Sequence, residues 1–426
     1  MRTTLSSLGV FLVVTAGSAP AAALGPALFA FFPNYNQSEP VREGAHCWNE
    51  PSSMPPGREG ACGPPVLVRR STGRYTVTVP NGAPFPAVFG DSGYQVYVQT
   101  VGGTANCFDT ALSTDAASTL ISDIHCVTPA GSDVDANFSW YYRADSFEYR
   151  QFMGHSPDHG YATVDADGAI RADESFNPIG PGLVTSSRDG NGLYTVTFQY
   201  MNPADGAYVV DTKFNLNNVL VSKTCVGDDT ESCSRAVCVP YAWTVGTYTN
   251  RDTTVEVRCY DRGGSPAGGA RDTNFRVFVG EEAHTSQTMP PGNPNEFLAE
   301  WFGWIDWDGI NAANVCYDDT YFRHRNQHET PAANPYTEPL SVCKTATGSY
   351  DVKAQTLFYA ADKLIPIVSA REVGGVYCNV EDVCWGISEG QNCAGNEPRI
   401  TVKCYDRSGS PVDASFNMST AYPQWD

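Results

Sequence analysis

The sequence predicts an all-β protein, built as three tandem, disulfide-stapled β-sandwich repeats of the immunoglobulin-like type. Two sequence patterns each recur three times, and one of them shows the period-2 alternation of a strand. The chain of 426 residues is too long for one ordinary core and suits three domains of typical size. The best candidate for a helix, Asn295–Ile305, is rich in aromatic residues that suit a strand equally well.

Residues 1–23 have the features of a secretory signal peptide. Arg2 precedes an apolar run from Leu8 to Val14, and small residues follow up to Ala23, near which we expect cleavage. The apolar run is too short to span a bilayer. We therefore expect a secreted protein, located extracellularly, in a periplasm or at a cell surface.

The composition is acidic and rich in aromatic residues. The formal net charge is −20, and the chain contains 22 Tyr, 20 Phe and 8 Trp. Such a charge repels nucleic acid and anionic lipid, so it argues against nucleic-acid binding and membrane insertion. A protein or a glycan is the expected partner, and the sequence leaves the oligomeric state open.

The first recurrent pattern is Gly-x-Tyr-x-Val. It begins at Gly73, Gly192 and Gly348, in the strings GRYTVTV, GLYTVTF and GSYDVKA. Apolar and polar residues alternate in it, as in a half-buried strand. Another strand-like run follows each string and reads YQVYVQT, NNVLVSK or LIPIVSA. Because turn-forming residues separate these runs, each repeat is expected to contain several short strands.

The second pattern starts with a cysteine at the end of an alternating run. The cysteines are Cys126, Cys259 and Cys404, and the last two begin the near-identical strings CYDRGGSP and CYDRSGSP. Each copy continues to Asp-x-x-Phe, with the aspartates at Asp135, Asp272 and Asp413. We interpret the pattern as a hairpin: a strand with an inward cysteine, a turn, and a returning strand. The aspartates are expected to bond turn amides, and equivalent cation sites are the alternative.

These patterns divide the chain beyond the signal peptide into three sandwich repeats, with spans 26–145, 146–285 and 286–426. Each span is about the size of a single β-sandwich domain. The linkers are weakly marked, and Thr288–Asn295, which reads TMPPGNPN, is the clearest of them.

All fourteen cysteines are expected to form disulfides, since an even number in a secreted chain indicates a disulfide framework. The inward cysteine of each second pattern is assigned a partner that follows the middle strand of its repeat. The three equivalent bridges are then Cys107–Cys126, Cys225–Cys259 and Cys378–Cys404. Local pairs account for the other eight cysteines: Cys47–Cys62, Cys233–Cys238, Cys316–Cys343 and Cys384–Cys393. The sequence alone leaves other pairings open.

The Gly-x-Tyr-x-Val strand, the lone cysteine and the Cys-Tyr-Asp string together resemble tandem repeats in secreted proteins of actinobacteria and myxobacteria. The resemblance covers nearly all of the chain beyond the signal peptide. It implies a secreted bacterial β-repeat protein, and it transfers no catalytic residue, because the repeat pattern has none. The first repeat departs most, with His125-Cys126-Val127 in place of Cys-Tyr-Asp.

The segment TVDADGAIRADE is the strongest candidate for a metal site. With Gly168 at the sixth position of a calcium loop, Asp165, Asp167 and Glu174 fall at ligand positions. Thr163 occupies the first position, where the loop requires Asp, and no helical pattern flanks the segment. A hairpin with a DADG turn therefore fits better, and no cofactor is assigned; calcium is the alternative.

Two hydrolase signatures are incomplete. The string VFGDSGY, residues 88–94, contains the GDSG of trypsin-like proteases, but His46 is the one earlier histidine and the usual Gly-Pro does not follow. In HRNQHE, two histidines lie four residues apart, as in zinc hydrolases. Arg325 and Gln327 occupy the positions where the catalytic glutamate would be required. We interpret both segments as loops, the second inside the Cys316–Cys343 bridge.

The densest aromatic cluster is WFGWIDWDG, residues 301–309. Trp304 and Trp307 would stack on a sugar, and Asp306 and Asp308 would bond its hydroxyls or act as an acid pair. An opening strand of the third repeat, with its aromatic residues in the core, explains the cluster more simply. We therefore expect a secreted, non-enzymatic protein that acts in binding or surface structure. The alternative is a glycan-active hydrolase that uses Asp306 and Asp308.

Overall fold

The expectation of an all-β, disulfide-rich fold is confirmed by the computed structural model of the chain. The described part contains 25 strands, which form five antiparallel or mixed sheets. The structure describes residues 27–32, 42–46, 64–80, 92–117, 119–146, 159–177, 182–199, 218–227, 233–244, 252–262, 269–280, 301–305, 316–317, 322–326, 341–353, 365–371, 375–384 and 399–421. None of the described helical segments is long and apolar enough to cross a membrane.

The strands fall into three consecutive sets, which we call units one, two and three. Unit one comprises β1 (Ala27–Phe32), β2 (Arg42–His46), β3 (Val66–Ser71), β4 (Arg74–Val79), β5 (Ser92–Val101), β6 (Asn106–Thr114), β7 (Leu120–Val127) and β8 (Asn137–Ser146). Unit two comprises β9 (His159–Val164), β10 (Ile170–Phe176), β11 (Val184–Gly190), β12 (Leu193–Phe198), β13 (Asn218–Lys223), β14 (Ala236–Thr244), β15 (Thr253–Asp261) and β16 (Phe275–Gly280). Unit three comprises β17 (Trp301–Ile305), β18 (Cys316–Tyr317), β19 (Phe322–Asn326), β20 (Ser341–Ala346), β21 (Ser349–Lys353), β22 (Ile365–Ala370), β23 (Tyr377–Cys384), β24 (Arg399–Tyr405) and β25 (Phe416–Ala421).

The same strand order recurs in all three units. One sheet of each has the order β2-β1-β8-β5, β10-β9-β16-β13 or β19-β17-β25-β22. The other has the order β3-β4-β7-β6, β11-β12-β15-β14 or β20-β21-β24-β23, and β18 adds to the edge of the last. The recurrent sequence patterns therefore correspond to a recurrent topology of two four-stranded sheets.

Each unit packs its two sheets around a core of alternating apolar side chains. In unit two, the inward residues Tyr194 and Val196 of β12 meet Val255 and Val257 of β15, and all four are fully buried. Residues from β9, β13 and β16 close the same core from the opposite sheet. Thus the Gly-x-Tyr-x-Val pattern forms strands β4, β12 and β21, as the alternation predicts.

The expected hairpin after each recurrent cysteine is wrong. β7 and β8 belong to different sheets, and so do β15 and β16, and β24 and β25. Only a single bridge closes each turn, between Val127 and Asp133 in unit one and at the equivalent positions in the other units. The chain then crosses from one sheet to the other, because the following Phe must enter the core from the opposite side.

The equivalent disulfides join directly opposed residues on neighbouring strands. They are Cys107–Cys126, Cys238–Cys259 and Cys378–Cys404, each with a Cα–Cα distance of 4.0 Å. The predicted pairs Cys225–Cys259 and Cys233–Cys238 are wrong, since Cys225 bonds Cys233. The reason is sheet membership: Cys225 follows β13, whereas the strand that pairs with β15 is β14, which carries Cys238.

The remaining disulfide predictions have mixed outcomes. Cys316–Cys343 is confirmed. Cys384 is disulfide-bonded, but its predicted partner Cys393 lies outside the described residues. The predicted pair of Cys47 and Cys62 also lies outside them.

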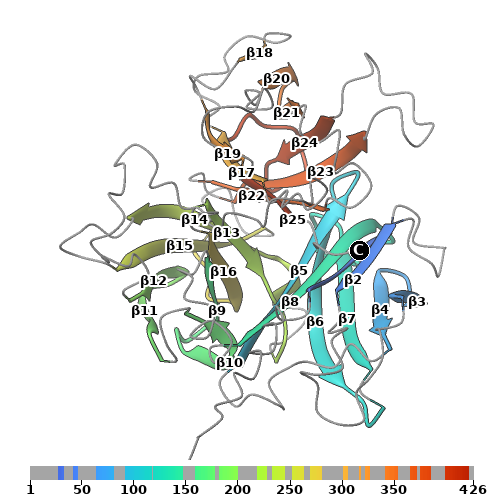
Figure 1. Cartoon of the computed structure of the whole chain (residues 1–426). Coiled ribbons are helices and arrows are strands. Elements are labelled where there is room, and N and C mark those ends of the chain that lie inside the picture. The colour runs from blue at the N-terminus through green and yellow to red at the C-terminus, as the bar shows by residue number, and fades with distance from the viewer. Residues whose placement is uncertain are drawn as a thin grey trace, which may run out of the picture.

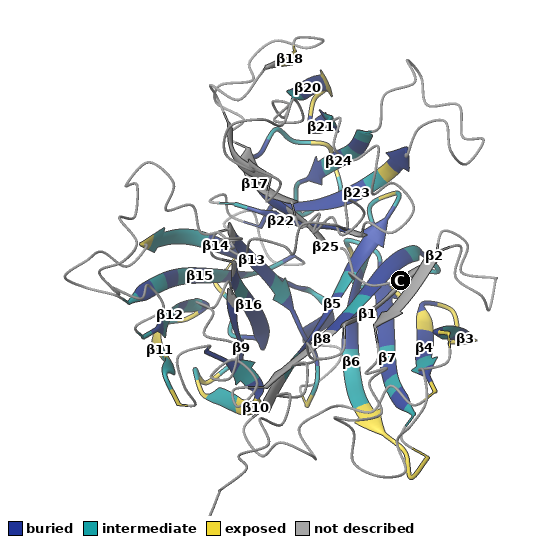
Figure 2. Cartoon of the chain, viewed as in Figure 1, coloured by how far each residue is buried: buried dark blue, intermediate teal, exposed yellow. Residues whose placement is uncertain are grey.

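The three units pack against one another around their middle strands. Figure 1 shows unit one at the lower right, unit two at the lower left and unit three above them, with β5, β13 and β22 meeting between the units. A parallel bridge between Val101 of β5 and Val380 of β23 joins sheets of units one and three into one nine-stranded sheet. Figure 2 shows that β5 and β23 are buried along most of their described length.

Candidate functional site

The recurrent aspartates hold the two sequence patterns of each unit together. In unit one, Asp135 accepts hydrogen bonds from the Gly73 amide (2.9 Å), the Tyr75 hydroxyl (2.9 Å) and the Arg69 guanidinium (2.6 Å). Asp272 accepts the same set of bonds from Gly192, Tyr194 and Arg188, and Asp413 from Gly348, Tyr350 and Lys344. Protein donors therefore surround these carboxylates, in agreement with the turn-bonding interpretation.

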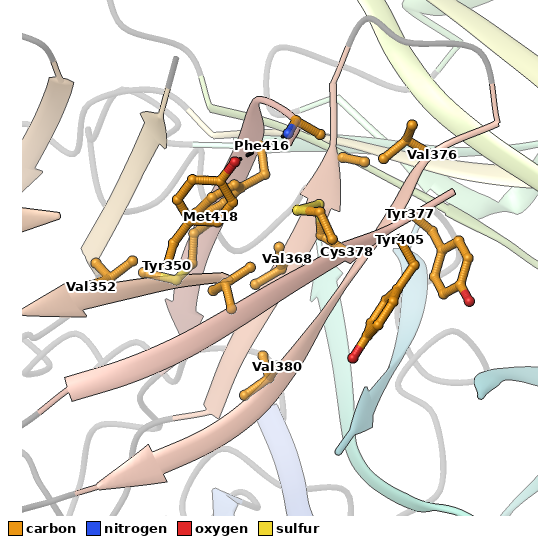
Figure 3. Close-up of a cluster of buried hydrophobic side chains, with 14 of the residues drawn as sticks. Tyr350, Val352, Val368, Val376, Tyr377, Cys378, Val380, Tyr405, Phe416 and Met418 are labelled. Carbon is orange, nitrogen blue, oxygen red and sulfur yellow. Dashed lines mark hydrogen bonds between the residues drawn. A yellow bond between two sulfur atoms is a disulfide. The ribbon is translucent and has the colours of Figure 1, made fainter. Parts of the chain in front are cut away.

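The tyrosine of the first pattern completes this cluster. The hydroxyls of Tyr75 and Tyr350 accept the backbone amides of Ala136 and Ala414 at 3.2 Å, and Figure 3 shows the bond made by Tyr350. The three rings pack on the Phe of Asp-x-x-Phe, with centroid distances of 5.4, 4.9 and 5.4 Å. Burial, together with the adjacent aspartate, raises the pKa of each tyrosine. The phenols thus stay protonated and act as structural donors.

The glycine of the first pattern is required by a close backbone approach. Gly192 has a φ of +63°, and a Cβ atom there would lie 2.4 Å from the Cys259 carbonyl oxygen. Gly73 and Gly348 have φ values of +67° and +65° and approach the backbone of Cys126 and Cys404 in the same way. These contacts, and not chemistry at a site, explain why the glycine recurs.

The aspartates remain ionised to low pH because of their donors. The Arg69 hydrogen bond lowers the pKa of Asp135 to about 2, and the Gly73 amide assists. The Arg188 hydrogen bond likewise lowers the pKa of Asp272. For Asp413, burial acts against ionisation, but the Gly348 amide and Lys344 still lower the pKa.

The Cys-Tyr-Asp-Arg string contributes an inter-unit clamp, defined by Tyr260, Arg262, Tyr377, Tyr405 and Arg407. Arg262 of unit two stacks on Tyr377 of unit three, 3.9 Å from the ring centroid. Arg407 of unit three lies 5.6 Å from the ring centroid of Tyr260 in unit two. Tyr377 packs beside Tyr405 at 5.5 Å, at one end of the unit-three core (Figure 3), and donates a hydrogen bond to the Thr104 carbonyl of unit one. The duplicated string therefore joins the units.

Equivalent residues of the three middle strands meet at the centre of the molecule. Tyr97 of β5, Leu220 of β13 and Ile367 of β22 form one buried cluster. These residues occupy the same position of the runs YQVYVQT, NNVLVSK and LIPIVSA, so the units are related by an approximate threefold axis. A cavity of about 80 Å³ lies between the strands, and we call it the axial cavity.

Hydrogen bonds between units surround the axial cavity. The Val368 amide of unit three donates to the Gln99 side chain of unit one at 2.9 Å. The Ser369 hydroxyl donates to the Val221 carbonyl of unit two at 3.1 Å. Each middle strand thus contacts a neighbouring unit through backbone groups as well as through side chains.

A buried ion network, the Arg276 network, joins units one and two. Arg276 of β16 is fully buried and pairs with Asp109 of unit one and with Glu174 of β10, the latter at 3.2 Å. It also donates to the Val96 carbonyl of unit one at 3.2 Å. Burial raises the pKa of Asp109. Burial opposes the ionisation of Glu174 as well, but Arg276 and Arg171 keep its pKa low.

The calcium candidates form a hairpin turn with arginine partners. Asp165 pairs with Arg171 at 2.5 Å, and Glu174 pairs with the same arginine at 3.2 Å. Asp167 accepts the Ala169 amide within the turn at 2.9 Å. The DADG hairpin between β9 and β10 is confirmed. Arg171 is thus the partner of both Asp165 and Glu174, two of the residues proposed as calcium ligands. Within the described ranges, no three His, Cys, Asp or Glu residues form a metal-ligating group.

The other candidate residues are placed only in part. Trp304 lies on β17, which takes the position of an opening strand next to β25, as β1 does next to β8. Asp306, Trp307 and Asp308 lie outside the described residues, so the hydrolase hypothesis stays a prediction. His324 lies in strand β19, where a loop was expected, because β19 pairs with β17. His328 and residues 88–91 of the GDSG string lie outside the described residues.

Sequence reasoning missed the charged residues at the unit junctions. Arg276, Asp109 and Lys223 have no charged counterpart of the same kind at the equivalent positions of the other two units. A search for recurrent residues therefore does not find them. One signal was available: Arg276 interrupts the apolar run FRVFV, and a charge in such a strand marks a buried polar contact. Comparison of the chain with family models, with curated proteins and with solved structures gives no significant match.

Proposed function

We propose that the chain is a secreted, non-enzymatic protein that acts in binding or surface structure, with its three units forming one rigid scaffold. The main support is the use of the recurrent polar residues. The Gly, Tyr, Asp and Arg residues that recur are bonded to one another within units or clamp one unit to the next. Side chains engaged in this way are unsuited to proton transfer or nucleophilic attack.

Disulfides and surface character support the proposed location and partner class. Disulfides persist in oxidising compartments, and five are formed within the described residues. The one large apolar side chain that is exposed in the described part is Val68. A partner that binds the described surface would therefore recognise polar groups, which fits a glycan or a hydrophilic protein better than a membrane.

A combined retention and turnover assay tests the proposal. The purified chain is incubated with insoluble cell-wall and polysaccharide preparations, and we measure its depletion from the supernatant and the release of reducing ends. The proposal predicts retention on at least one preparation without product release. Product release that disappears in the double variant Asp306→Asn/Asp308→Asn would instead establish the hydrolase. No retention on any preparation, together with free diffusion of the native protein in culture, contradicts a binding or surface role.

A further inference from the structure

A buried histidine, His125 of β7, lies at the junction between units one and two. It is 3% exposed, and its ring packs edge-to-face with the Phe108 ring, with the centroids 5.3 Å apart. Phe108 is its register partner on β6 and forms one buried cluster with Val127 and with Cys225 and Cys233 of unit two. The histidine therefore belongs to the layer of side chains that joins the two units.

The two nitrogens of the His125 ring differ in their partners. The Nε2 atom lies 2.7 Å from the Asp133 carboxylate, and because a carboxylate only accepts, the neutral ring carries its proton on Nε2. The Nδ1 atom is buried and has no hydrogen-bond partner among the described residues. A second proton would therefore create a buried N–H donor without an acceptor, together with a positive charge.

The partner of the histidine also belongs to a segment that contacts unit two. Asp133 follows a turn in which Gly131 approaches Arg235 of unit two so closely that a Cβ atom on the glycine would lie 2.9 Å from the Arg235 Cγ atom. On the other side of the histidine, the Cys225 amide of unit two donates to the Asp109 carbonyl of β6 at 3.0 Å. A change of charge on the ring is thus placed between two inter-unit contacts.

The charges around His125 act against its protonation on balance. Arg74 of β4 is its second register partner and lies 3.4 Å from the Asp133 carboxylate, so it shares that acid with the histidine. The Lys223 ammonium of unit two lies 3.8 Å from the ring centroid of Phe108. Burial lowers the pKa of His125, and although the hydrogen bond to Asp133 raises it, the charges of Arg74 and Lys223 add to the effect of burial.

The other carboxylates on the adjoining strands have partners of their own. Asp123, two residues before His125 on β7, accepts the Thr76 hydroxyl of β4 at 2.7 Å. Asp109 of β6 pairs with Arg276. A third cation, Arg235, lies against the turn that precedes Asp133. Asp133 is therefore the acid that supports a protonated ring, and its side chain is 42% exposed.

The equivalent positions of the other units carry permanent cations. The residue before the recurrent cysteine is His125, Arg258 or Lys403. Arg258 stacks on Tyr241 at 3.3 Å and Lys403 pairs with Glu381 at 2.7 Å, and both cations are only partly buried. His125 is fully enclosed, and it is the one of the three whose charge changes between about pH 5 and 8.

We propose that His125 makes the junction between units one and two pH-sensitive, because protonation at its Nδ1 atom loosens the contact with the residues that flank the Cys225–Cys233 disulfide. The folded-state pKa of His125 lies below the unfolded value of about 6.5. The stability that the neutral ring contributes is therefore present above that pH and is lost as the pH falls through the folded-state pKa. Mild acid thus weakens this junction before it unfolds the chain.

Hydrogen exchange of two amides in the whole chain, followed by NMR, tests the proposal. The Cys225 amide reports on the junction between units one and two, and the Gly102 amide, which donates to the Val380 carbonyl at 2.8 Å, reports on the junction between units one and three. After correction for intrinsic exchange rates, protection of Cys225 should fall at least about fivefold between about pH 7.5 and 5, and that of Gly102 less than about twofold. A loss at Cys225 that is absent, or no larger than the loss at Gly102, overturns the proposal.

A variant and a titration assign the effect to the histidine. His125→Gln stays neutral and keeps an amide donor for Asp133, so Cys225 should lose no more protection than Gly102, whereas the control His324→Gln in unit three should retain the wild-type difference. If His125→Gln fails to fold, the ring resonances of His125 in the wild-type protein decide. They should titrate below about pH 6.5 with the same midpoint as the loss of protection at Cys225. A different midpoint, or a pH-dependent loss that persists in His125→Gln, contradicts the assignment.

Discussion

The Arg276 network offers the sharpest mutational test of how units one and two are joined. The substitution Arg276→Met removes the cation that faces Asp109 and Glu174 and preserves an unbranched apolar stem. Asp109 is 2% exposed, and among the described residues its carboxylate would keep only the hydrogen bond from the Thr224 hydroxyl, at 3.2 Å. Glu174 would retain Arg171. The damage therefore falls mainly on Asp109.

The magnitude follows from burial of an unpaired carboxylate. Removing one partner of a buried ion pair destabilises a protein by about 3–5 kcal/mol, because the other charge stays buried. We expect a loss of that size in the free energy of unfolding, measured by urea titration at pH 7. Since the Asp109 pKa is already raised by burial, its protonation in the variant would bring the loss towards the lower end of the range.

A double variant separates this cause from simple loss of packing. Arg276→Met/Asp109→Asn removes the stranded charge, so it should be more stable than Arg276→Met by about 1–2 kcal/mol. If the single variant lies within about 1 kcal/mol of the wild type, or if Asp109→Asn brings no recovery, the network does not stabilise the junction as described.

Three other predictions concern the recurrent residues. Gly192→Ala should lower the free energy of unfolding, measured by urea titration, by more than about 3 kcal/mol, because its Cβ would lie 2.4 Å from the Cys259 oxygen. The control Gly182→Ala is also at positive φ but has nothing within 4 Å of its Cβ, so it should cost only about 1–2 kcal/mol. Equal losses in the two variants would refute the close-approach explanation. The pKa of Asp135 is lowered to about 2 in the folded state, so the stability that its carboxylate contributes is present above the unfolded pKa of about 3.9 and is lost as the pH falls towards 2. Asp135→Asn should therefore be less stable than the wild type at pH 6 and show a smaller change of urea midpoint between pH 4 and pH 2. Identical acid profiles of the two proteins would contradict the assignment. Peptide mapping without reduction should join Cys238 to Cys259 and Cys225 to Cys233, and a Cys225–Cys259 peptide would show that β13 and not β14 supplies the bridge.

The local features of the fold were predictable because they depend on neighbouring residues. Alternation around Tyr75, Tyr194 and Tyr350 sets which side chains enter the core, so the strands could be assigned without knowledge of the rest of the chain. The bridge Cys107–Cys126 could be assigned because Cys107 is the one cysteine between the middle strand of unit one and Cys126.

What depends on sheet membership or on distant packing could not be predicted in this way. In unit two, three cysteines precede Cys259, and the choice between Cys225 and Cys238 depends on which strand pairs with β15. Arg276 and Asp109 are 167 positions apart and belong to different units, so no periodicity connects them. The roles of Arg262 and Tyr377 likewise depend on how the units meet, which one copy of the repeat does not encode.

Small-angle X-ray scattering of the whole chain beyond residue 23 tests most directly whether the recurrent residues build one body of three packed units. A compact body of that length should have a radius of gyration of about 22 Å, with a single-peaked distance distribution. A chain of separately tumbling sandwiches would give a radius of gyration above about 30 Å and a distance distribution with an extended shoulder. The first result is the one expected from the clamp and the Arg276 network, and the second would contradict the packing of the units around a common axis.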